Sequence, residues 1–77
     1  MVNKNERGII ERYEQEGWKT LRGGAPDFVF LKLGDNGQII DQVFVEVKSK
    51  DAELTYEQSV YRKIIQKLGA KYKVEIL

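Results

Sequence analysis

The dipeptide Asn36-Gly37 stands between two apolar runs, residues 27–33 and 39–48, and constrains the fold more than any other feature. An Asn-Gly pair in this setting is the strongest short-range signal for a β-hairpin. It predicts a two-residue type I′ loop, because both loop positions then need positive φ angles. The loop in turn determines which residues of the two strands face each other.

The register set by this loop brings two acidic residues together. Phe30 falls opposite Val43, and further from the loop Asp27 falls opposite Glu46, with Cβ atoms about 5 Å apart. Two carboxylates so placed repel each other unless a proton or a cation lies between them. A bulge near Pro26 would instead shift the register by one residue and turn Asp27 to the other face.

Glu46 interrupts an otherwise apolar strand, between Val45 and Val47. A carboxylate is uncommon in a core strand unless it is paired or holds a metal ion. Because side chains alternate along a strand, Lys48 lies on the same face as Glu46. The strand therefore predicts a buried acid with a lysine beside it.

A first helix is predicted over residues 5–16, with Asn5 as its N-cap and Gly17 as its stop. Glu6 falls within its apolar stripe, so one acid of this helix points inward. The alternative is that Glu6 is a first-turn acid stabilised by the helix dipole. The stripe itself consists of Ile9, Ile10 and Tyr13.

Residues 18–22 predict a short strand, and a second helix opens further along the chain. Thr55 is its expected N-cap, with Gln58 at the third helical position of a capping box, and Gly69 ends it. Gln58 lies within the apolar face of this helix. That face comprises Leu54, Tyr61, Ile65 and Leu68.

A final strand over residues 71–77 completes the order α-β-β-β-α-β. Runs of this length and order predict a single domain over residues 1–77, of the α/β (α+β) class. A chain of 77 residues has a small core, so association with a second copy would add stability.

Composition excludes several kinds of site. The chain has no cysteine and no histidine, which excludes disulfides, thiolate zinc sites and a histidine general base. Its 13 basic and 12 acidic residues give a net charge of +1, which does not by itself indicate a nucleic-acid partner. No apolar run is long enough for a membrane span, and the first residues do not resemble a signal peptide. We therefore expect an intracellular, cytoplasmic protein without a membrane partner.

The predicted site consists of Asp27, Glu46 and Lys48 on one sheet face, with Glu6 and Gln58 directed inward from the helices. Oxygen donors without histidine or cysteine suit a hard cation, Mg²⁺ or Mn²⁺. A lysine beside a metal-bound water orients that water and stabilises charge on a phosphate. Carboxylates, a divalent cation and lysine together predict phosphodiester hydrolysis. Gln58 has a simpler alternative role, as a capping residue only.

Three motifs, in residues 24–27, 46–48 and 54–58, resemble the Pro-Asp, Glu-x-Lys and Gln motifs of the PD-(D/E)xK nuclease superfamily. They are similar in order and spacing to the small VRR-NUC type and to archaeal Holliday-junction resolvases. The resemblance covers nearly the whole chain. It implies a minimal restriction-endonuclease-like core, with a central mixed sheet flanked by helices.

The resemblance also implies roles for the site residues. Asp27 and Glu46 would ligate the metal together with the backbone carbonyl of Val47. Lys48 would position or activate the attacking water. Glu6 would complete the acidic cluster directly or through water, or Glu11 would replace it if the helix begins later.

Gln58 would, by the same resemblance, support the site or contact the scissile region of the DNA. The substrate implied is branched or Holliday-junction DNA, cut by a homodimer or higher homo-oligomer. Candidate phosphate contacts are Lys19, Arg22, Lys50, Arg62, Lys63 and Lys67. The last three have the alternative of a solvated helix face.

Two other functions fit the sequence. The first is a catalytically silent DNA-binding or assembly subunit with the same fold. The second is a structural module in which Lys48 neutralises Glu46.

Overall fold

The computed structural model describes residues 4–22 and 27–77. The elements follow one another in the predicted order α-β-β-β-α-β. They are α1 (Lys4–Gln15), β1 (Lys19–Arg22), β2 (Phe28–Leu33), β3 (Ile39–Lys48), α2 (Tyr56–Lys67) and β4 (Lys71–Ile76). Residues 23–26, which contain the first three residues of the predicted Pro-Asp motif, lie outside the described ranges.

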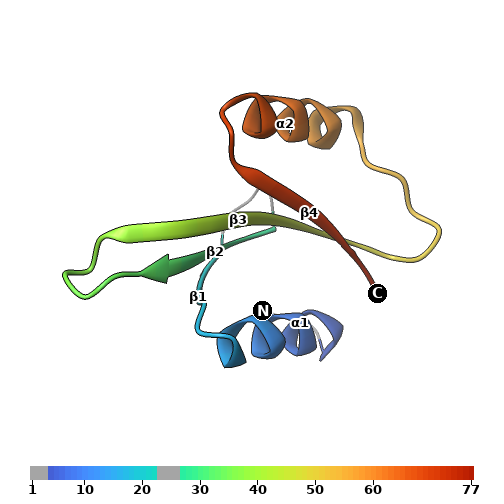
Figure 1. Ribbon diagram of the computed structural model, residues 1–77. Coiled ribbons are helices and arrows are strands. Elements are labelled where there is room, and N and C mark those ends of the chain that lie inside the picture. The colour runs from blue at the N-terminus through green and yellow to red at the C-terminus, as the bar shows by residue number, and fades with distance from the viewer. Residues whose placement is uncertain (1–3, 23–26) are drawn as a thin grey trace.

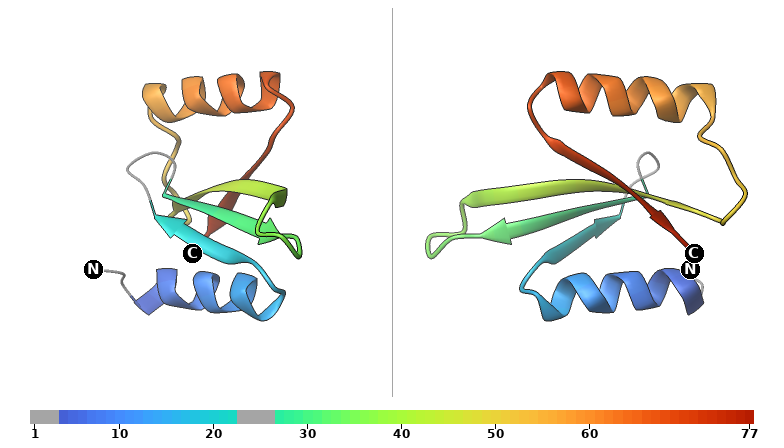
Figure 2. Two further views of the ribbon diagram at one scale, coloured as in Figure 1. Left: turned by 90° about the vertical axis from the view of Figure 1, so that its left-hand side faces the viewer. Right: turned by 45° about the vertical axis from the view of Figure 1, so that its right-hand side comes forward.

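The four strands form one mixed sheet in the order β1-β2-β3-β4. The neighbours β1, β2 and β3 are antiparallel, whereas β4 runs parallel to β3. Helix α1 covers one face of the sheet and α2 lies over the other (Figures 1 and 2). The expected α+β class, with helices on both sides of a mixed sheet, is confirmed.

The face beneath α1 holds the apolar core. Tyr13 of α1 stacks on Phe30 of β2, with ring centroids 4.1 Å apart, and Trp18 meets Tyr13 edge to face. Phe30 is fully buried, as expected for a large side chain that carries much of the burial energy of a small domain. The other core residues are Ile9, Phe28, Val43 and Val45, with Ile10 and Val47 packed against them.

Helix α1 begins one residue earlier than predicted. It starts at Lys4, so the prediction that Asn5 is the N-cap is wrong, and Asn5 lies inside the helix. The other end is as expected, because Gly17 adopts a φ of +92° directly after the last turn. A glycine tolerates this left-handed conformation without the clash that a Cβ atom would cause.

The β2–β3 hairpin has a different loop from the predicted one. Gly37 has a φ of +80°, but Asn36 does not have a positive φ, which excludes a type I′ turn. The Gly37 N–H donates to the Gly34 carbonyl at 3.0 Å, and the Gly34 N–H donates to the Gln38 carbonyl at 2.8 Å. These bonds define a three-residue loop that ends in a left-handed glycine, the next most common hairpin connection.

The register of the hairpin is nevertheless the predicted one. The three-residue loop pairs Leu33 with Ile39, one residue out of the expected register. A bulge then inserts an extra residue into β3, and Lys32 pairs with Asp41 as predicted. The two departures cancel, so Phe28 faces Val45 and the pairing continues correctly toward the site.

Helix α2 starts as predicted but presents a different face. Thr55 and Gln58 form the full capping box. Ile65 is buried, whereas Tyr61 is 46% exposed and Leu68 is 80% exposed, so the predicted inward placement of these two residues is wrong. Gly69, at a φ of +86°, ends the helix as predicted.

The two helices of the described ranges are too short and too polar to cross a membrane.

Candidate functional site

The site forms where the start of β2 meets the end of β3. Asp27 directly precedes β2, and its Oδ2 accepts a hydrogen bond of 2.8 Å from the backbone N–H of Val47. Its carboxylate lies beside that of Glu46, close enough for a hydrogen bond between the two side chains to affect Glu46. The alternative register that would turn Asp27 to the other face is therefore excluded.

Glu46 is buried, with 3% of its surface exposed, amid mainly apolar strand residues. Its pKa is raised above the ordinary value, first because burial disfavours the charged form and second because the Asp27 charge and hydrogen bond favour a proton on Glu46. The positive charge of Lys48 opposes this rise. Negative charge on both carboxylates at once is therefore unfavourable in this environment.

The amide of Gln58 connects α2 to this pair. Its Oε1 accepts the N–H of Thr55 at 2.9 Å, as part of the capping box. This bond directs the amide nitrogen the other way, and Nε2 donates to Oε1 of Glu46. Gln58 is thus both a capping residue and a site residue, so the two roles predicted as alternatives coexist.

Lys48 lies half-buried near the end of β3, on the Glu46 side of the strand. In the part of the chain that the structure describes, the ion pairs are Arg12 with Glu75 and Lys71 with Asp41. Lys48 therefore acts on Glu46 through its charge without a direct ion pair. This placement argues against a structural module in which Lys48 neutralises Glu46.

Tyr72 of β4 is a site neighbour that the sequence motifs did not indicate. It lies beside Phe44 in the parallel β3–β4 pairing. Burial raises the pKa of Tyr72, and the nearby charges of Glu46 and Asp27 raise it further. The charge of Arg62 has the opposite effect on the pKa of Tyr72, which places that predicted DNA contact close to the same phenol.

Glu6 remains apart from the carboxylate pair. It is half-buried on α1, whereas the alternative acid Glu11 is exposed. Over residues 4–22 and 27–77, no three acidic side chains come close enough to hold one metal ion. The predicted direct cluster of three carboxylates is not formed, and a contribution of Glu6 through water stays a prediction.

The predicted phosphate contacts are spread over several elements and are exposed. Lys19 and Arg22 lie on the edge strand β1, and the Arg22 guanidinium sits 6.0 Å above the Phe28 ring. Lys50 lies two residues beyond the site end of β3. Three more contacts, Arg62, Lys63 and Lys67, come from α2.

The donor set of the pair fits a hard divalent cation. Mg²⁺ is commonly bound through only one or two carboxylates, with waters and other oxygens completing its shell. Asp27 and Glu46 supply two carboxylates whose mutual repulsion a cation would relieve. The carbonyl of Val47 as a further ligand stays a prediction.

Comparisons with protein-family models, with curated proteins and with solved structures gave no match.

Proposed function

We propose that this protein is a metal-dependent endodeoxyribonuclease with a site of the PD-(D/E)xK type. Its cofactor would be Mg²⁺ or Mn²⁺, and its substrate branched or Holliday-junction DNA, cut by a homodimer. The observation that carries the proposal is the buried Glu46, held against Asp27 and bonded by the Gln58 amide. Two carboxylates side by side, one of them buried, destabilise the fold unless a proton or a cation lies between them, and such groups cluster at functional sites.

The residues of the chain divide the work of phosphodiester hydrolysis. Asp27 and Glu46 would hold the cation, and each carboxylate is oriented by a neighbour, Val47 N–H or the Gln58 amide. Lys48 would orient the attacking water and offset negative charge on the phosphate as the water oxygen bonds to phosphorus and the bond from phosphorus to the leaving oxygen breaks. The attacking water loses a proton to solvent, and the leaving oxygen takes up a proton from solvent. When bound, the cation supplies Lewis-acid polarisation of the phosphate and lowers the pKa of the water.

A catalytically silent DNA-binding subunit is the second candidate. One observation favours it, namely that the described residues bring two carboxylates together but not three. Such a subunit would keep the fold and the basic surface and would bind DNA without turnover.

The test uses labelled four-way junction, flap, nicked and linear duplex DNA, each with Mg²⁺, Mn²⁺ or EDTA. Wild type is expected to cleave at least one substrate with a divalent ion and none with EDTA. Lys48→Ala is expected to reduce the rate by about 100-fold or more, because the lysine acts where charge develops. The matched control is Lys73→Ala, an exposed lysine of β4 that lies beside Val45, and it should leave the rate unchanged.

Two outcomes count against the nuclease. DNA binding that weakens with salt but gives no cleavage supports the silent subunit. Neither binding nor cleavage excludes both functions.

A further inference from the structure

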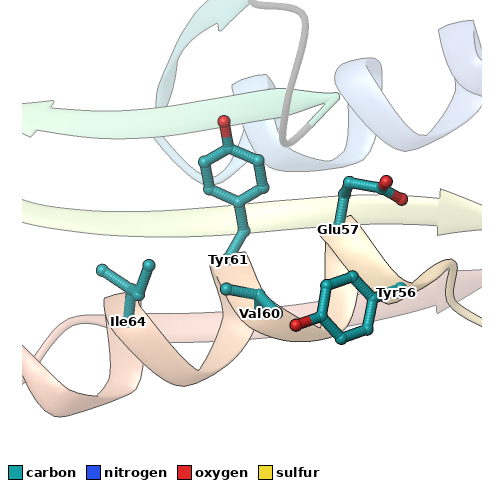
Figure 3. A pocket seen from close by; sticks show the side chains of 5 residues that line it. All are labelled: Tyr56, Glu57, Val60, Tyr61 and Ile64. Atoms are coloured by element: carbon teal, nitrogen blue, oxygen red, sulfur yellow. The ribbon is translucent and has the colours of Figure 1, made fainter.

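Helix α2 has an apolar stripe on the side away from the sheet. Tyr56 is 79% exposed and Leu68 is 80% exposed, and Ile64, between them, is 51% exposed. The side chains drawn in Figure 3 border a hollow on this helix, and the volume of the hollow is about 330 Å³. They are Tyr56, Glu57, Val60, Tyr61 and Ile64. Large apolar groups gathered in this way on a small protein indicate an interaction surface.

The order of residues along the stripe is self-complementary. If a second α2 lies antiparallel across the first, Val60 faces Ile64 of the second copy and Tyr56 faces Leu68 of the second copy. Each of these contacts occurs twice, because a two-fold axis exchanges the two helices. At about 100° per residue, all four positions lie on one side of the helix, centred between Val60 and Ile64.

The charged residues beside the stripe are also compatible with a two-fold axis between antiparallel helices. Glu57 lies in the first turn of α2 and Lys67 in the last turn. In the antiparallel arrangement each Glu57 lies level with Lys67 of the second copy across the stripe, so opposite charges come near each other at both ends. A parallel arrangement would place like charges side by side, which favours the antiparallel pair.

We propose that the outer face of α2 is a homodimer interface, in which two α2 helices pack antiparallel about a two-fold axis. Gln58 and Ile65 point toward the sheet, so this packing leaves the Gln58 bond to Glu46 in place. Lys67, one of the predicted phosphate contacts, has a role in the dimer instead. The proposed interface does not depend on nuclease activity, and the experiment below measures dimerisation only.

The experiment is sedimentation equilibrium of the full chain over a range of concentrations, with circular dichroism to check folding. Wild type is expected to form a dimer, and Ile64→Glu should raise the dimer dissociation constant by about 100-fold, because it buries two charges in the stripe. The matched control is Ile40→Glu, a similarly exposed isoleucine (63%) in the β2–β3 hairpin. It should leave dimerisation unchanged.

Charge reversal gives a second test that does not disturb the apolar stripe. Glu57→Lys and Lys67→Glu alone should each raise the dissociation constant by about tenfold, because each creates two like-charge pairs. The double variant Glu57→Lys/Lys67→Glu should return to nearly the wild-type value. A wild type that stays monomeric at millimolar concentration overturns the proposal. So does a dimer that tolerates Ile64→Glu, or single reversals that the double variant fails to rescue.

Discussion

Burial places the Glu46 carboxylate among strand residues, a second carboxylate lies beside it, and an amide donates to it. Burial and the Asp27 charge both favour the protonated form of Glu46, and a backbone hydrogen bond at Asp27 and the charge of Lys48 oppose them. Without a cation the folded protein therefore binds a proton at Glu46 more tightly than the unfolded chain does. This difference links stability to pH.

The raised pKa of Glu46 predicts the direction in which the stability of the protein changes with pH. Because the folded pKa of Glu46 lies above its ordinary value of 4.5, its contribution to stability is present at acidic pH and is lost as pH rises through the folded pKa. Without divalent ions, Glu46→Gln should remove this loss and raise the free energy of unfolding at pH 7 by about 1 kcal/mol. Urea unfolding of both proteins between pH 4 and 8 measures the effect.

Glu75 is the matched control, because its pKa is shifted the other way. Burial would raise the pKa of Glu75, but hydrogen bonds from Arg12 and Tyr13 hold it below the ordinary value. Its contribution is present above the unfolded pKa and is lost as pH falls, so Glu75→Gln should lower stability at pH 7. If both variants change stability in the same direction, the role assigned to Glu46 is wrong.

The sequence predicted the positions of individual site residues where the alternation of side chains along a strand determines them. The pairing of Asp27 with Glu46 could be predicted because the hairpin determines the residues that face each other. The place of Tyr72 could not, because β4 reaches β3 through a long crossover, and no turn motif sets the register of a parallel pair. Glu6 was predicted to point inward from helix periodicity, which says nothing about its distance from the pair.

Among the elements, the β2–β3 hairpin has the predicted strand register although its loop type was predicted wrongly. An Asn-Gly pair was expected to fill both positions of a two-residue turn, but here only Gly37 adopts a positive φ. The third loop residue and the bulge beside Leu33 compensate for each other. The bulge has no sequence signal in Ile39 and Ile40, so the detail could not be predicted.

The loop geometry predicts unequal effects of substitutions at Asn36 and Gly37. Gly37→Ala should lower the free energy of unfolding by about 1 kcal/mol or more, because alanine is strained at a φ of +80°. The cost comes from the backbone, since a Cβ atom there meets nothing within 4 Å. Asn36→Ala should be nearly neutral, because Asn36 has no positive φ. Equal losses in urea unfolding would support the type I′ turn instead.

Helix α2 illustrates a second limit of sequence reasoning. Its capping box could be predicted because Thr55 and Gln58 act locally. Its buried face could not, because the helix has apolar residues on more than one side and tertiary packing selects among them. The structure buries Ile65 and leaves Tyr56 and Leu68 outside, where the proposed dimer would cover them.

In the whole molecule, one face of the sheet carries the apolar core and the other carries the polar site. The α1 face is closed by stacked aromatic rings such as Tyr13 on Phe30 and by the Arg12 to Glu75 ion pair. Helix α2 lies over the other face (Figure 2). Gln58 of this helix binds Glu46 of the carboxylate pair there, and Lys48 lies on the same side of β3 as Glu46. A small domain thus concentrates its stability on one side and its polar site on the other.

Mn²⁺ titration by calorimetry at pH 7 measures whether Asp27 and Glu46 form a divalent-cation site. Wild type and the control Glu75→Gln should bind Mn²⁺ with similar affinity. Glu46→Gln should weaken binding by about 10- to 100-fold or more, because it removes one of two charged ligands. Wild type that binds no Mn²⁺, or Glu46→Gln that binds it equally well, would show that Asp27 and Glu46 do not form a cation site.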